Sequence, residues 1–296
     1  MSDPARLLDQ EAEAWDRLTA VLASCPGGRR REPSVTPDGW SVHVVIVHAG
    51  AWLDDCARVL GRIALSTWDP ATAEEETAAY VERVNATHAE RARGMTDDEA
   101  DEWLHTSRER ARSAFTGLTE HGRDAWGWFE ESGPMHYAKH EHDLRAWLAG
   151  APPDPDVGPL LQGETDAWLT FRVAVDAVAP DVVLDEPPGW TVADVTFHMT
   201  AWMRQSAADI EANRGWGHDD DPDEDAIVDA MNAGFLADGR THDQGEARAQ
   251  LDRARTLIRA AFAGLPSPSG EAKDWFAANG VQHYAEHIEP LLRAGR

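Results

Sequence analysis

The sequence has very few cysteines and no long apolar run. Only Cys25 and Cys56 occur among 296 residues, which excludes a disulfide framework and a cysteine-based metal cluster. No stretch of about 18 consecutive apolar residues is present, so no membrane-spanning segment is predicted. Residues Met1 to Leu8 lack the basic and apolar regions of an export signal. We therefore expect a cytoplasmic protein.

Basic side chains are also scarce. The chain carries 27 lysines and arginines against 53 aspartates and glutamates, which gives a formal net charge of −26. An acidic surface of this kind repels phosphate backbones and anionic lipids. We therefore expect neither nucleic acid nor a membrane as a partner, and expect a small-molecule substrate instead.

Several sequence motifs of catalysis are absent. There is no glycine-rich phosphate loop, no Gly-x-Ser-x-Gly nucleophile elbow and no His-Glu-x-x-His helix. Long β-branched runs are scarce, whereas 42% of the residues are hydrophobic and 27% are charged. This combination is typical of amphipathic helices, and it predicts an all-α fold.

The chain contains an internal duplication. A segment that begins with Trp-Ser/Thr-Val and continues into His-x3-Trp occurs twice, with its histidine at His48 and, 150 residues later, at His198. A terminal His-Tyr-Ala-x-His motif runs from His136 to His140 and recurs 147 residues further on. Repetition on this scale indicates two copies of one domain.

The joint between the copies is predicted in residues 149–155, Ala-Gly-Ala-Pro-Pro-Asp-Pro. A glycine after a helical run and closely spaced prolines end a helix and stiffen a linker. We therefore expect a boundary near residue 153, with a first helical domain over residues 1–150 and a second over residues 156–296.

Helix starts can also be predicted from the sequence. Ser41 and Thr191 directly follow the tryptophan of a turn and are residues that favour the N-cap, and Thr96 begins a capping box. Asp69-Pro70 predicts a further start, because proline favours the first helical position. Each half is interpreted as a helix bundle whose last helix carries the paired histidines.

The repeated histidines are candidate metal ligands. Residues i and i+4 lie on one face of a helix, so the two histidines of the terminal motif can point at one site. A third histidine from another helix would complete a site with open positions for water or substrate, as at a catalytic metal. Zinc is the favoured metal, and nickel and iron(II) also suit such ligands. Of 13 histidines only six recur in both halves: His48, His136, His140, His198, His283 and His287.

Four tryptophans recur in each half, and core packing or anchoring of turns is the plain interpretation. Trp52 and Trp202 lie four residues after a candidate ligand, on the same helix face, so they are candidates for the wall of a substrate pocket. Asn85 and Asn232 also recur, and the sequence predicts no purpose for them.

Glu11 and Glu164 recur on the first helix of each half. A carboxylate that points inward near a metal could orient a ligand or act as a base, so these are the candidate catalytic residues. Exposure to solvent is the alternative. Tyr137 and Tyr284 follow a candidate ligand but lie about 100° round the helix from it, which favours a structural hydroxyl over an acid catalyst.

Together these motifs resemble those of the DinB-like superfamily of four-helix bundles, which includes mycothiol-dependent maleylpyruvate isomerases. The terminal His-Tyr-x-x-His motif, with Leu144 and Trp147 after it, also resembles the branch that contains the colibactin self-resistance protein. The resemblance covers both halves. It implies two tandem DinB-like four-helix bundles, each with a divalent metal held by the three histidines named above.

The resemblance also implies a function. It is that of a metal-dependent enzyme acting on a reactive small-molecule electrophile, of the thiol-dependent transferase or isomerase type, with a low-molecular-weight thiol as co-substrate. The alternative is a self-resistance protein that hydrolyses or sequesters a reactive natural product, with or without metal. Because single-domain members of the superfamily pair, we expect a monomer whose halves form a pseudo-dimer.

Overall fold

The computed structural model describes residues 4–218 and 221–295. Within these ranges the regular structure is helical, and the only β-type pairing is an isolated bridge between Val183 and Thr191. The predicted all-α fold class is therefore confirmed. None of the helices in the described ranges is both long enough and apolar enough to span a bilayer.

The chain divides into two compact units, one ending at Pro155 and the other beginning at Asp156. The segment before this division ends a helix in the way that the sequence predicts. Gly150 has a φ of 73°, and the backbone N–H groups of Gly150 and Ala151 bond back to the carbonyls of Trp147 and Ala146. This pattern is a Schellman motif, which glycine favours because it has no Cβ to clash.

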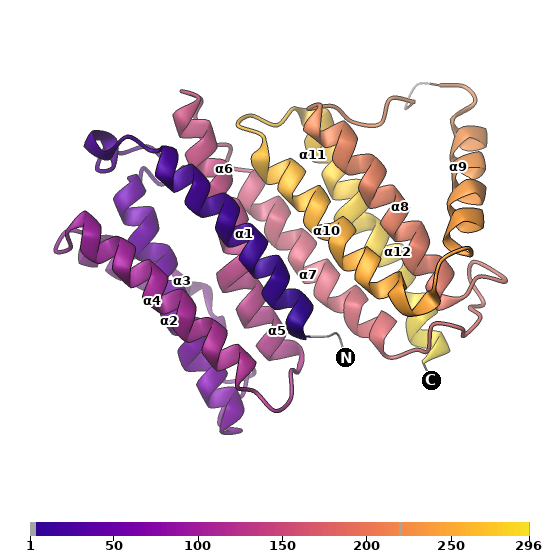
Figure 1. The fold of residues 1–296 in the computed structure, drawn as a ribbon, viewed down its shortest axis with the longest axis horizontal. Helices are drawn as coiled ribbons and strands as arrows, with labels where there is room; N and C mark the ends of the chain where they lie inside the picture. The colour runs from indigo at the N-terminus through magenta and orange to yellow at the C-terminus, as the bar shows by residue number, and fades with distance from the viewer. Residues whose placement is uncertain (1–3, 219–220, 296) are drawn as a thin grey trace. The chain divides into compact units, whose positions relative to one another are not determined.

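The described residues of the first unit, from Pro4 onward, form six α-helices, α1 to α6 (Figure 1). A five-residue π-helical segment, η3, joins the last two, and two short 3-10 turns precede α2 and α3. α2 packs along α4, and α1 packs along α6. The bounds are α1 (Pro4–Ser24), η1 (Gly27–Arg29), α2 (Val42–Ala64), η2 (Glu74–Glu76), α3 (Ala78–Ala92), α4 (Asp97–Thr116), α5 (Arg123–Glu130), η3 (Glu131–Met135) and α6 (His136–Leu148).

The second unit repeats the order of the α-helices, whereas the 3-10 turn in its described residues lies between α9 and α10. α8 packs along α10, α7 packs along α12, and a second π-helical segment, η5, again precedes the last helix. The bounds are α7 (Val157–Asp176), α8 (Val192–Glu211), α9 (Glu224–Gly239), η4 (Gln244–Glu246), α10 (Ala247–Gly264), α11 (Gly270–Ala277), η5 (Ala278–Gln282) and α12 (His283–Ala294).

The predicted N-caps are confirmed. The Ser41 side chain accepts a backbone hydrogen bond at the start of α2, and Thr96 and Thr191 form capping boxes at α4 and α8. The helix start predicted at Asp69-Pro70 is wrong. The Asp69 carboxylate instead accepts the backbone N–H of Ala71, at 3.1 Å, and this local bond closes a turn rather than a helix.

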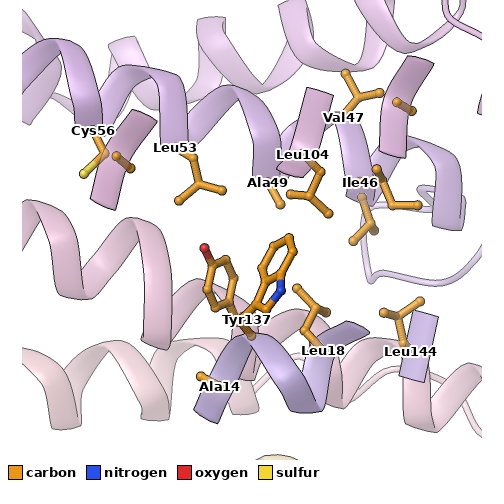
Figure 2. Packing of buried hydrophobic residues seen from close by; sticks show 14 of the residues in the cluster. Ala14, Leu18, Ile46, Val47, Ala49, Leu53, Cys56, Leu104, Tyr137 and Leu144 are labelled. Atoms are coloured by element: carbon orange, nitrogen blue, oxygen red, sulfur yellow. The ribbon is translucent and has the colours of Figure 1, made fainter. Parts of the chain in front are cut away.

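The hydrophobic core of the first unit draws side chains from α1, α2, α4, α5 and α6. Figure 2 shows the ring of Tyr137 among Ala14 and Leu18 of α1 and Ala49 and Leu53 of α2. The tyrosine is completely buried. Because a buried hydroxyl requires a hydrogen-bond partner, this packing needs a polar group inside the core.

That polar group is Glu11, which is only 1% exposed. Its carboxylate accepts a hydrogen bond from the Tyr137 hydroxyl of α6, at 3.2 Å. It also forms ion pairs with two arginines of α4, with Arg108 at 2.7 Å and with Arg112. One side chain of α1 therefore connects three helices.

This arrangement of one buried glutamate with two arginines and a tyrosine, here called the brace, also occurs in the second unit. The Glu164 carboxylate accepts bonds from Arg255 at 2.7 Å, from Arg259 at 2.7 Å and from the Tyr284 hydroxyl at 3.0 Å. Burial alone would raise the pKa of Glu164, but the two guanidinium groups outweigh burial and hold that pKa below its ordinary value. The carboxylate is therefore ionised at neutral pH.

Burial in ion pairs excludes solvent exposure for Glu11 and Glu164. In both units the carboxylate is engaged by two arginines and a tyrosine hydroxyl, and its candidate role as a general base stays a prediction. What the structure shows is a buried brace between helices. Two glycines of the π-helical segments make room for it, since a Cβ at Gly133 or Gly280 would lie 3.4 or 3.0 Å from the glutamate Cγ.

Replacing Glu164 by Gln should destabilise the protein by about 3–5 kcal/mol, because it leaves buried guanidinium charge without its carboxylate. Glu11→Gln should lower the unfolding free energy by less. The arginine side chains paired with Glu11 are 19% and 31% exposed, whereas those paired with Glu164 are 2% and 5% exposed. Urea unfolding monitored by circular dichroism measures both. Glu13→Gln, at an exposed position of α1, is the control. Equal losses for the two brace variants would contradict this ranking.

The same brace predicts a dependence on pH. Since folding lowers the pKa of Glu164 below 4.5, its stabilisation is fully present above about pH 4.5. It is lost as the pH falls through the lower pKa of the folded state. The difference in unfolding free energy between the wild type and Glu164→Gln should therefore narrow in acid. A difference that widens in acid would contradict the assignment.

Candidate metal centres

The first unit brings three histidines together. His48 comes from the first third of α2, and His136 and His140 come from adjacent turns of α6. One ring nitrogen from each lies within 4.8 Å of the others. His48 Nε2 and His136 Nε2 are 2.8 Å apart, and both His48 and His140 are buried. This group of three could hold a metal ion.

The second unit forms the equivalent group. His198 comes from α8, and His283 and His287 come from α12. Their candidate ligand atoms also lie within 4.8 Å of one another, and His198 Nε2 is 2.9 Å from His283 Nε2. The six histidines that recur in the sequence therefore form two separate groups of three, one inside each unit.

A π-helical segment directly precedes the first ligand of each terminal helix. η3 ends at Met135 and η5 ends at Gln282, one residue before His136 and His283 respectively. The wider turn of a π-helix shifts the register of the residues that follow it, and such segments are frequent at functional sites. The register that turns both histidines inward is thus built by the same local feature in each unit.

Two ring nitrogens support metal binding most directly. His140 Nε2 and His287 Nε2 are buried and have no hydrogen-bond partner. A buried polar atom without a partner costs about 1–3 kcal/mol, and a bound metal would remove that cost. Nitrogens that share a tetrahedral zinc at about 2.0–2.1 Å lie about 3.3 Å apart, which falls between the shortest separations here, 2.8 and 2.9 Å, and the 4.8 Å that bounds all of them. The donor set fits a divalent metal.

Burial keeps these histidines in the form that binds metals. Removal from water, followed by repulsion from neighbouring imidazoles, lowers the pKa of His48 well below its ordinary value. The same causes lower the pKa of His198 to about 3, and burial lowers that of His287 to about 4. The rings are therefore neutral at pH 7 and can each donate a lone pair.

Tryptophans pack against the ligand rings. The Trp40 ring centroid lies 4.5 Å from that of His48, and Trp190 lies 5.1 Å from His198. Trp52, the predicted pocket residue of the first unit, has its ring centroid 6.4 Å from His48. Two tryptophans thus pack on His48 in the first unit. In the second unit Trp190 packs on His198, while Trp202 packs on Trp216, Phe235 and Trp275.

The repeated asparagines hold the candidate pocket tryptophans. Asn85 Oδ1 accepts the indole N–H of Trp52 at 3.1 Å, and Asn232 Oδ1 accepts that of Trp202 at 2.9 Å. The sequence showed the repetition of these asparagines but not their partners. Each bond ties a middle helix, α3 or α9, to the helix that carries a ligand.

Several residues of the site were missed in the sequence. Trp68 and Trp216 each extend the aromatic group, lying 5.7 Å from Trp128 and 5.3 Å from Trp275. The arginines of the braces were also missed, although Arg-x3-Arg-x2-Phe occurs in both halves with the 147-residue displacement of the terminal motif. His88, which has no histidine counterpart in the second half, lies with its Nδ1 3.5 Å from His48 Nδ1.

Comparisons of the chain with models of protein families, with curated proteins and with solved structures gave no significant match. The function must therefore be argued from the chemistry of the site.

Zinc should stabilise the metal-free protein against unfolding. At a free zinc concentration about 1,000 times the dissociation constant, the gain is about 4 kcal/mol for the unit that binds it. His136→Ala should remove the gain of the first unit and His283→Ala that of the second. Calorimetric unfolding with and without zinc measures each effect, with the exposed His105→Ala as control. A gain that persists after both ligand substitutions would contradict these sites.

Proposed function

We propose that the protein is a metal-dependent enzyme that joins a low-molecular-weight thiol to a reactive electrophile, or isomerises such an electrophile with the help of the thiol. Each unit would be a DinB-like bundle with its own metal centre. The observation that carries the proposal is the convergence of three imidazoles in each unit, where His140 Nε2 in the first unit and His287 Nε2 in the second are buried without a hydrogen-bond partner.

The residues that would hold the metal are the two groups of three histidines. Three protein ligands would leave room at a bound ion for water or a thiol, which distinguishes catalytic from structural sites. A divalent metal bound there supplies a Lewis acid, which lowers the pKa of a thiol or of water at the open position. Zinc remains the favoured metal because it accepts imidazole ligands in this number and geometry.

The chain's own side chains supply the surroundings of that position. Trp40 and Trp52 pack around His48 in the first unit, and Trp190 packs on His198 in the second. Large aromatic surfaces exclude water and bind apolar parts of a ligand. Exclusion of water favours attack by a thiol over hydrolysis of a reactive electrophile.

The test is turnover with a defined set of substrates. Zinc-loaded protein should convert an α,β-unsaturated carbonyl compound or an epoxide when a thiol such as mycothiol or glutathione is present. Transfer consumes the thiol, whereas isomerisation regenerates it. The double variant His140→Ala/His287→Ala should fall to the uncatalysed rate, because each unit loses a ligand. His105→Ala should retain full turnover. Loss of electrophile and thiol is followed by mass spectrometry.

Other results would favour the alternative of self-resistance. Consumption of the electrophile without thiol would support hydrolysis. Tight binding of the electrophile without turnover, unchanged after removal of the metal, would support sequestration. Equal turnover by the wild type and the double variant would contradict a role for the histidines in catalysis.

A further inference from the structure

Two of the three ligands in the first unit have a hydrogen-bonding partner on their second ring nitrogen. The first is His140, whose Nδ1 lies 3.2 Å from Asp143 Oδ2 on the same helix. Asp143 is 2% exposed and also lies 3.7 Å from the Lys139 ammonium. Since His140 Nε2 is the unpartnered atom, this bond sets the tautomer that leaves Nε2 free for a metal.

The second supported ligand is His48. Its Nε2 faces His136, whereas its Nδ1 lies 3.5 Å from the Nδ1 of His88, a buried residue of α3. Trp52 fixes the ring of His88 from another side, with the two ring centroids 6.0 Å apart. His88 therefore lies beside the Nδ1 of His48, where it can accept the His48 N–H and act as an outer hydrogen-bond partner of this ligand.

The second unit has neither partner. Positions 147 residues after His88 and Asp143 are Phe235 and Pro290. Phe235 packs on Trp202 at 5.4 Å, as His88 packs on Trp52, so the two positions correspond in space as well as in sequence. Phenylalanine and the proline ring have no side-chain group that accepts a hydrogen bond from an imidazole.

One consequence is visible at His198, the counterpart of His48. Its Nδ1 is buried without a hydrogen-bond partner, whereas that of His48 contacts His88. Outer partners of this kind fix the orientation of a ligating imidazole and raise its basicity. Their removal lowers metal affinity by roughly 10–100-fold.

We infer that the two centres are unequal: the first binds metal more tightly, with His88 and Asp143 as positioning residues, and the second binds it more weakly. At limiting metal the protein then holds one ion, in the first unit. The inference rests on the proposed metal function and adds to it which centre is loaded first.

Single-site chains test the inference. His287→Ala leaves the first centre intact, and His140→Ala leaves the second. Zinc affinity of each full-length chain is measured by competition with a chromophoric chelator. The first centre should bind zinc roughly 10–100-fold more tightly. Affinities within threefold of each other would overturn the inference while leaving the metal function standing. Absence of zinc binding by either chain would instead overturn the metal function itself.

Exchange of the outer residues tests their role. In the chain that retains the first centre, His88→Phe and Asp143→Ala should each weaken zinc binding about tenfold or more. Asp143→Asn, which keeps an acceptor for the imidazole N–H, should recover part of the loss. In the chain that retains the second centre, Phe235→His is the reciprocal change and should strengthen binding.

Two measurements separate a loss of ligand positioning from a general loss of structure in these variants. The absorption bands of bound cobalt(II) should shift in His88→Phe, because they report the ligand field. The unfolding temperature of the metal-free variant should stay that of its parent chain. A weaker affinity with an unchanged cobalt(II) spectrum and a lowered metal-free unfolding temperature would overturn the positioning role.

Discussion

The architecture of each unit depends on holding three uncharged imidazoles against one another inside a helical core. Their nitrogens lie within 4.8 Å of one another, where protonation of one ring would repel the next. Burial keeps the rings unprotonated. It also leaves some of the ring nitrogens without a hydrogen-bond partner, which costs free energy. A divalent cation bound there would relieve both the crowding of lone pairs and the missing hydrogen bonds.

The rotation of the terminal helix is what makes this convergence possible, and the brace fixes that rotation. Tyr137 lies between His136 and His140 in sequence, and its hydroxyl is tied to Glu11 on the far side of the core. The π-helical segment before His136 sets the register, and Gly133 within it makes room for the glutamate. The buried ion pairs therefore support the helix that carries two of the three histidines, and the second unit repeats the arrangement.

Much of this could be predicted from periodicity and repetition. The all-α class, the N-caps and the identity of the six clustered histidines follow from spacing that helices impose. What could not be predicted depends on contacts between distant segments. Glu11 looked like a surface or catalytic carboxylate because its arginines lie about a hundred residues away. Asp69-Pro70 failed as a helix start because a local turn satisfied the aspartate. His88 has no histidine counterpart in the second half, so repetition did not mark it, and its contact with His48 is one of two differences between the centres, the other being that of Asp143 with His140.

The most direct test of the account is the number of zinc ions per chain, counted by native mass spectrometry after equilibration with zinc in a volatile buffer. We expect two zinc ions per chain in the wild type, one in His140→Ala, one in His287→Ala and none in the double variant. An unchanged count in the double variant, or no zinc in the wild type, would contradict a metal centre built from three histidines in each unit.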